Sequence, residues 1–251
     1  MANIAEKSDF QSPRQNVIDF LADFTAETTP FSADKVDDFR EILRPGTTVF
    51  ITFLPGSDFE DTISIAARLK KEGLNPVPHL AARSIPDAAF LDEGLRRLRG
   101  EADIDEVLTI AGAVDQPLGA FSDSMQVLET GLLDKHGIKR IGVAGHPEGS
   151  PDMPDEAIAA ALTWKNDFAN RSGADVYIVT QFCFEAEPII AWDKAIRAAG
   201  NALPIRIGVP GLATIKTLLN YAKACGIGNS MMFLKKQARN VAKLMNVSAP
   251  D

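Results

Sequence analysis

Short apolar runs alternate with segments of helical periodicity along most of this chain. In the segment 155–171, for example, Ala, Leu, Trp and Phe recur at spacings that one helix face can bury. We expect each short apolar run to form a buried strand and each longer segment to form a helix. The expected strands are 22–27, 48–54, 75–80, 106–110, 141–144, 176–179 and 204–209.

The expected helices begin and end at recognisable signals, such as Pro after Ser at 12–13 and Gly after the segment 58–72. They cover 13–21, 32–43, 58–72, 85–99, 121–136, 155–171, 188–199, 213–225 and 230–245. Strands that alternate with crossover helices form a parallel sheet wound in one sense. No G-x-G-x-x-G turn follows the first strand, as a dinucleotide-binding sheet would need.

The pattern therefore predicts an α/β fold, a TIM-type (β/α)8 barrel, occupying residues 1–251 as a single domain. Residues 1–21 would be an N-terminal extension. An eighth strand is not visible in the sequence. Either the barrel is open, or the chain is shortened, or a partner chain or second copy completes it.

Composition narrows the classes of partner. The 251 residues are 45% hydrophobic and carry a net charge of −8, which disfavours binding to a nucleic-acid backbone. The two cysteines and three histidines show no metal-ligand spacing, so we expect no metal site. No apolar run is long enough to span a membrane and the N-terminus has no signal core, which predicts a cytoplasmic protein.

Polar residues follow several of the apolar runs, where catalytic and binding residues of α/β barrels collect. Glu27 could act as a general acid, or be a solvated loop glutamate. His79 could contact a ligand, or pack and donate to a backbone carbonyl. His146 and Glu148 would present a polar edge, and the Gln181 amide could bind a heterocycle or a neighbouring loop.

Six short motifs together resemble the methylenetetrahydrofolate reductase family. They are FTAETTP, VPHL, GVAGHPEG, SGAD, IVTQFCF and IRIGVPG, in this order along the chain. The resemblance implies a TIM barrel that binds FAD and reduces 5,10-methylenetetrahydrofolate to 5-methyltetrahydrofolate with NAD(P)H.

Carried over by position, Glu27 matches the acid that helps to protonate the folate. Gln181 matches the glutamine that contacts the pterin, and Phe182 follows it in the same substrate-binding motif. His79 matches a histidine near the flavin. Phe182, taken from the residues alone, is more typical of core packing.

The positions at which this sequence departs from the family's motifs are those that contact the flavin in the family. Ala111 and Gly112 stand, with Ala113, where the family has R-G-D, and His146 and Glu148 lie in a loop that has lost the family's aromatic residue and second histidine. Ala111, Gly112, His146 and Glu148, together with His79, are the predicted cofactor contacts. Their chemistry predicts that FAD binds poorly or not at all, and that hydride passes directly from NAD(P)H to the folate.

The sequence thus predicts an oxidoreductase of one-carbon metabolism that interconverts 5,10-methylenetetrahydrofolate and 5-methyltetrahydrofolate. Its expected partners are the folate substrate and a nicotinamide cofactor. Two alternatives stay open, a non-catalytic folate-binding subunit and another barrel enzyme such as an aldolase. An aldolase would need a Schiff-base lysine, and no predicted strand carries one.

Overall fold

A computed structural model describes residues 12–150, 153–183 and 185–211 of the chain. Seven strands form one sheet in the order β1-β2-β3-β4-β5-β6-β7, and every neighbouring pair is parallel. The strands are β1 (Ala26–Thr28), β2 (Thr48–Ile51), β3 (Asn75–Ala81), β4 (Glu106–Ile110), β5 (Arg140–Gly145), β6 (Asp175–Phe182) and β7 (Ile205–Gly208).

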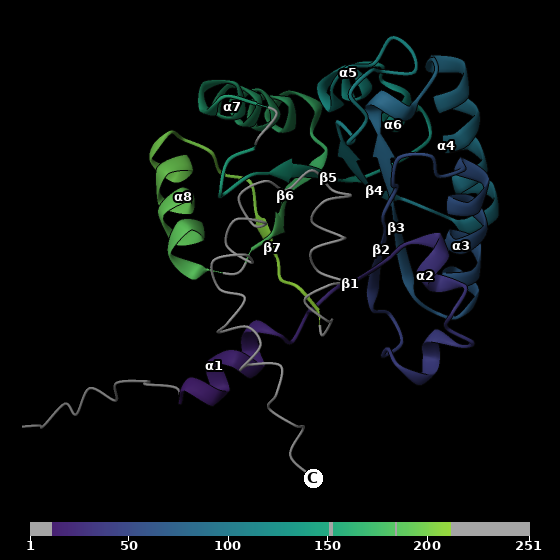
Figure 1. Cartoon of the computed structure of the whole chain (residues 1–251), viewed down its shortest axis with the longest axis horizontal. Helices are drawn as coiled ribbons and strands as arrows, with labels where there is room; N and C mark the ends of the chain where they lie inside the picture. Colours follow the sequence, from purple (N-terminus) through teal and green to yellow (C-terminus); the bar gives the residue numbers. More distant parts are fainter. Residues whose placement is uncertain (1–11, 151–152, 184, 212–251) are drawn as a thin grey trace, which may run out of the picture.

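The helices follow the strands along the chain. They are α1 (Pro13–Phe20), α2 (Pro30–Ala33), η1 (Phe39–Glu41), α3 (Phe59–Lys71), η2 (Ala82–Ser84), α4 (Ala88–Ala102), α5 (Ser124–Glu129), α6 (Leu132–Lys135), α7 (Asp155–Ser172) and α8 (Ala186–Ala198). Figure 1 shows α3, α4, α7 and α8 around the outside of a curled sheet, with α1 set apart from it. None of the residues of α1 is buried.

The curled sheet has a packed side chain layer on each face. Val49 and Ile51 of β2 belong to the large outer cluster between sheet and helices, whereas Phe50 packs with Leu108 and Tyr177 in a smaller inner cluster. Alternate residues of a strand point to opposite faces, so one strand supplies both layers. This arrangement confirms the predicted α/β fold of TIM type, and the seven strands of the described residues form a curled, partial barrel.

β1 and β7 are the two edges of this sheet within the described residues. The helices expected at 213–225 and 230–245 lie outside the residues that the structure describes. The position of β1 at an edge of the described sheet matters for the site, because β1 carries Glu27.

The prediction of a strand over 22–27 is wrong before Ala26. The backbone N–H groups of Ala22 and Phe24 donate to Asp19 and Leu21 in turns that follow α1, so they are not available to a sheet. The strand itself begins at Ala26, which pairs with Val49.

The single helix predicted over 32–43 is also wrong. Thr29, not Ser32, caps the first turn, and a separate 3-10 turn begins after Asp38. Arg68 of α3 explains why the helix can stop early. Its guanidinium donates to the backbone oxygens of Ala33 and Asp37, each at 3.0 Å, and thereby satisfies carbonyl groups that a continuous helix would have bonded.

The helix predicted over 121–136 divides into α5 and α6. Gly131 lies between them with φ of +70°, a conformation that glycine adopts without steric cost. The Thr130 hydroxyl accepts a hydrogen bond from the Leu132 backbone N–H at 3.2 Å, which helps to start α6.

Candidate functional site

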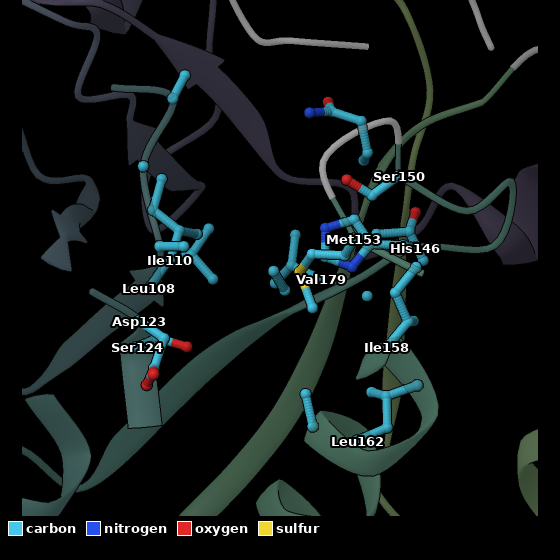
Figure 2. A pocket seen from close by; sticks show the side chains of 18 of the residues that line it. Leu108, Ile110, Asp123, Ser124, His146, Ser150, Met153, Ile158, Leu162 and Val179 are labelled. Atoms are coloured by element: carbon cyan, nitrogen blue, oxygen red, sulfur yellow. The ribbon is translucent and has the colours of Figure 1, made fainter. Parts of the chain in front are cut away.

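A cavity of about 260 Å³ opens at the carboxyl ends of the strands. Strands β4, β5 and β6 and helix α7 supply its apolar wall, and the loops after β2, β4 and β5 supply most of its rim. Figure 2 shows Asp123 and Ser124 on one side and His146, Ser150, Met153, Ile158 and Leu162 on the other. Of the eight predicted site residues, six line this cavity: Glu27, Ala111, Gly112, His146, Glu148 and Gln181.

Glu27 reaches the cavity from the exposed edge of the sheet. Its side chain oxygen Oε1 accepts a short hydrogen bond from the Thr52 hydroxyl, which lies just after β2. The Thr52 backbone N–H in turn donates to the Thr28 carbonyl at 2.8 Å. Thr52 therefore extends the β1–β2 pairing by one residue and orients the Glu27 carboxylate.

The loop after β5 presents His146 and Glu148. Gly145 is the last residue of β5 before this loop, and a Cβ there would stand 2.4 Å from the Ile178 side chain, so the close approach of β5 and β6 requires glycine. Burial, together with the nearby Lys165, lowers the pKa of His146 to about 4. This imidazole is therefore neutral near pH 7 and can donate or accept a hydrogen bond.

Gln181 lies near the end of β6 and is half-buried. Its side chain oxygen accepts a hydrogen bond from the Phe182 backbone N–H at 3.0 Å, which turns the amide group along the strand. Cys183 also lines the cavity, and burial, with Glu148 nearby, raises the pKa of its thiol to about 11. The thiol stays protonated and is a poor nucleophile.

Two predicted residues do not line the cavity. Phe182 is buried on the other face of β6 from Gln181, as the alternation of a strand requires. His79 lies inside the barrel with its ring edge-on to Phe50, at 6.1 Å between centroids. Their predicted contacts with substrate and cofactor stay predictions.

His79 is fully enclosed. Neither ring nitrogen has a hydrogen-bond partner among the described residues. Burial lowers the pKa of this imidazole, and the negative charge of Glu27 opposes the shift. His79 is thus a neutral ring, and its link to the site is its electrostatic interaction with Glu27.

Ala111 and Gly112 contribute small side chains and backbone to the cavity. Gly112 has φ of +92°, and a Cβ there would stand 3.2 Å from the Cβ of Ala81. Arg83 is a cationic residue of the cavity lining, and its guanidinium donates to the Ser122 carbonyl at 2.9 Å.

Lys165 is a cavity residue that sequence reasoning missed. It belongs to α7, and its side chain is 5% exposed while its ammonium nitrogen donates to the Ala144 carbonyl at 3.0 Å. The available signal was its spacing: Ile158, Leu162 and Lys165 fall on one helix face, and all three are buried.

The described part of the chain contains no group of three or more His, Cys, Asp or Glu residues that could hold a metal ion. No helix in this described part is long and apolar enough to cross a membrane.

Comparisons with known proteins agree on one family. A family model described as methylenetetrahydrofolate reductase matches residues 33–236. Methylenetetrahydrofolate reductase 2 of Saccharomyces cerevisiae is 31% identical over 83 residues, or 33% of this chain and 14% of the yeast protein. Methylenetetrahydrofolate reductase 1 of Schizosaccharomyces pombe is 39% identical over 88 residues, or 35% of this chain and 14% of that protein. Each aligned segment is thus a small part of the relative's own length.

Proposed function

Because this chain belongs to the methylenetetrahydrofolate reductase family, we propose that it interconverts 5,10-methylenetetrahydrofolate and 5-methyltetrahydrofolate in one-carbon metabolism, with NAD(P)H as the hydride donor. One observation carries the proposal. The family match over residues 33–236 includes most of the lining of a cavity at the strand ends, with Gln181 and an apolar wall, and Glu27 joins this cavity from just before the matched range.

Glu27 is the proposed general acid. Reduction begins when a proton reaches a ring nitrogen of methylenetetrahydrofolate, because this opens the five-membered ring to an iminium ion. Hydride addition to the iminium carbon then gives the methyl group. The Thr52 hydroxyl would hold the Glu27 carboxyl toward the substrate, since it already bonds one carboxyl oxygen.

Gln181 is the proposed contact to the pterin. The Phe182 backbone N–H donates to its amide oxygen, so the amide NH2 group is the part that would bind the ligand. An amide N–H can donate to a ring nitrogen or carbonyl of the pterin. Phe182 would support this contact by fixing the strand on its opposite face.

We further propose that the hydride passes directly from the nicotinamide and that FAD is not tightly held. The segment that would meet a flavin, Ala111–Gly112–Ala113, offers methyl groups and backbone and no cationic side chain. His146 is neutral near pH 7, so it supplies no positive charge to a flavin diphosphate. Both features fit a flavin poorly.

The test is an assay of NADH and NADPH oxidation by the purified chain with methylenetetrahydrofolate, with and without added FAD. We expect colourless protein and folate-dependent oxidation that added FAD does not increase. Flavin that stays bound in stoichiometric amount would overturn direct transfer. No oxidation with either nucleotide, under conditions where the folate binds, would overturn the enzymatic proposal.

A non-catalytic folate-binding subunit is the competing proposal, and the exposed position of Glu27 favours it. Glu27 is an exposed residue of β1, an edge strand of the sheet within the described residues. A second copy or a partner chain that covers this edge would restore the enclosure that proton transfer benefits from. Folate binding without NAD(P)H oxidation would support the non-catalytic subunit. NAD(P)H oxidation that appears at higher protein concentration would instead indicate that a second copy completes the site.

A further inference from the structure

Lys165 places an ammonium group in the wall of the cavity, and its hydrogen bond there goes to a backbone carbonyl. No Asp or Glu oxygen of the described residues lies within 4.0 Å of its nitrogen, and its hydrogen bond goes to the Ala144 carbonyl. Asp123, which also lines the cavity, acts on it only at longer range. A lysine ammonium has three N–H donors, so one carbonyl does not use its capacity.

Burying such a group is costly unless it gains a partner. Burial lowers the pKa of Lys165 to about 8, with Asp123 opposing the shift. The group is nevertheless mostly protonated near pH 7. A ligand that brings an electron-rich oxygen to this position would offset the cost. Lys165 lies on the buried face of α7, where a residue with a purely structural role would be apolar.

The surroundings indicate which part of a ligand comes close. Lys165 shares its helix face with Ile158 and Leu162, and Leu108, Ile110 and Val179 project into the same cavity. These side chains suit a flat ring. A cavity of about 260 Å³ with such walls does not suit an extended, highly charged diphosphate.

We propose that Lys165 binds an amide carbonyl oxygen carried on a ring of the substrate or the cofactor. Two sources share this chemistry under the proposed function, on which the inference rests: the lactam oxygen of the pterin and the carboxamide oxygen of the nicotinamide. A hydrogen bond from a charged donor to such an oxygen, inside an apolar cavity, is among the stronger kinds.

The experiment compares Lys165→Met, which keeps length and removes the charge, with Lys71→Met, which removes the same charge from an exposed position of α3. Dissociation constants are measured by calorimetry for 5-methyltetrahydrofolate, NADH and ADP-ribose, which lacks the nicotinamide ring. We expect Lys165→Met to weaken one of the two ring-bearing ligands by about 10- to 100-fold. ADP-ribose should bind both variants as it binds the wild type.

The ligand whose affinity falls in Lys165→Met identifies the source of the carbonyl oxygen. Weaker binding of the folate alone assigns the lactam oxygen, and weaker binding of NADH alone assigns the carboxamide. Unchanged affinities in Lys165→Met, or an equal loss for ADP-ribose, would overturn the assignment while leaving the proposed function intact. Failure of the wild type to bind either ring-bearing ligand would instead overturn the proposed function and this assignment with it. Thermal unfolding of each variant verifies that the fold is retained.

Discussion

The hydroxyl of Thr52 donates a hydrogen bond to Oε1 of Glu27 and so joins the carboxyl ends of β1 and β2. Glu27 belongs to β1, an edge strand of the described sheet, and Thr52 directly follows the neighbouring strand β2. A residue next to β2 thus helps to orient the proposed acid, and the two residues can be tested separately.

Glu27→Gln keeps size and hydrogen-bonding capacity and removes the proton that the reaction needs. A positioned general acid contributes about 10²–10⁴-fold to rate, so we expect turnover to fall by that order while folate binding persists. Glu148→Gln, at the other carboxylate of the cavity, is the matched control and should cost much less. Near-normal turnover of Glu27→Gln with intact folate binding would move the acid role elsewhere.

Thr52→Val removes the hydroxyl that orients Glu27 and nearly preserves the side chain's shape. We expect the maximal rate to fall by about 10-fold, corresponding to roughly 1.4 kcal/mol, with little change in stability. Thr62→Val is the control on α3, because the buried Thr62 hydroxyl has no hydrogen-bond partner among the described residues. That variant should retain full activity and be at least as stable in urea unfolding. Equal activities in the two variants would argue against a role for Thr52.

Gln181→Ala should weaken folate binding and leave the affinity for the nicotinamide cofactor nearly unchanged. The loss of one well-formed hydrogen bond is worth roughly 0.5–1.5 kcal/mol. Cys183→Ala, two residues further on and also in the cavity wall, is the control because its thiol stays protonated. Titration of each variant with the folate measures the difference. An unchanged dissociation constant in Gln181→Ala would remove the assigned contact.

Periodicity predicted the barrel well, because apolar runs and helical spacing are imposed by burial along the whole chain. It failed where a local competition or a distant side chain decided the outcome. Thr29 competes with Ser32 as a cap, and Arg68, far along the chain, satisfies the carbonyl groups of the interrupted helix. Neither effect has a signature in the segment that it changes.

The positions of Glu27 and Gln181 in the cavity agree with their predicted places near strand ends, whereas their roles stay predictions. Phe182 could have been placed better, because a residue adjacent to Gln181 in a strand points to the opposite face. Lys165 was missed for a different reason. A charged residue in a helix is expected in solvent, and only its register with Ile158 and Leu162 indicates that it is buried.

The buried charge of Lys165 should also be visible in the pH dependence of stability. Burial lowers its pKa in the folded chain from 10.5 to about 8, so the folded state resists protonation more than the unfolded state does. The energetic cost is fully present below about pH 8 and disappears as pH rises toward the unfolded value. Compared with Lys165→Met, the wild type should therefore gain on the order of 3 kcal/mol of unfolding free energy across this interval. Lys165→Met should accordingly be the more stable protein at neutral pH.

Urea unfolding of both proteins at about pH 7 and about pH 10 measures this change, and the difference between them cancels the titration of all other groups. Lys71→Met should follow the wild type at both pH values, because it removes an exposed charge. A difference between the wild type and Lys165→Met that stays constant with pH would mean that the ammonium is solvated. The lysine would then have no buried charge to offer a ligand. If the difference in unfolding free energy between the two proteins narrows as pH rises, the buried ammonium of Lys165 lowers the stability of the folded chain.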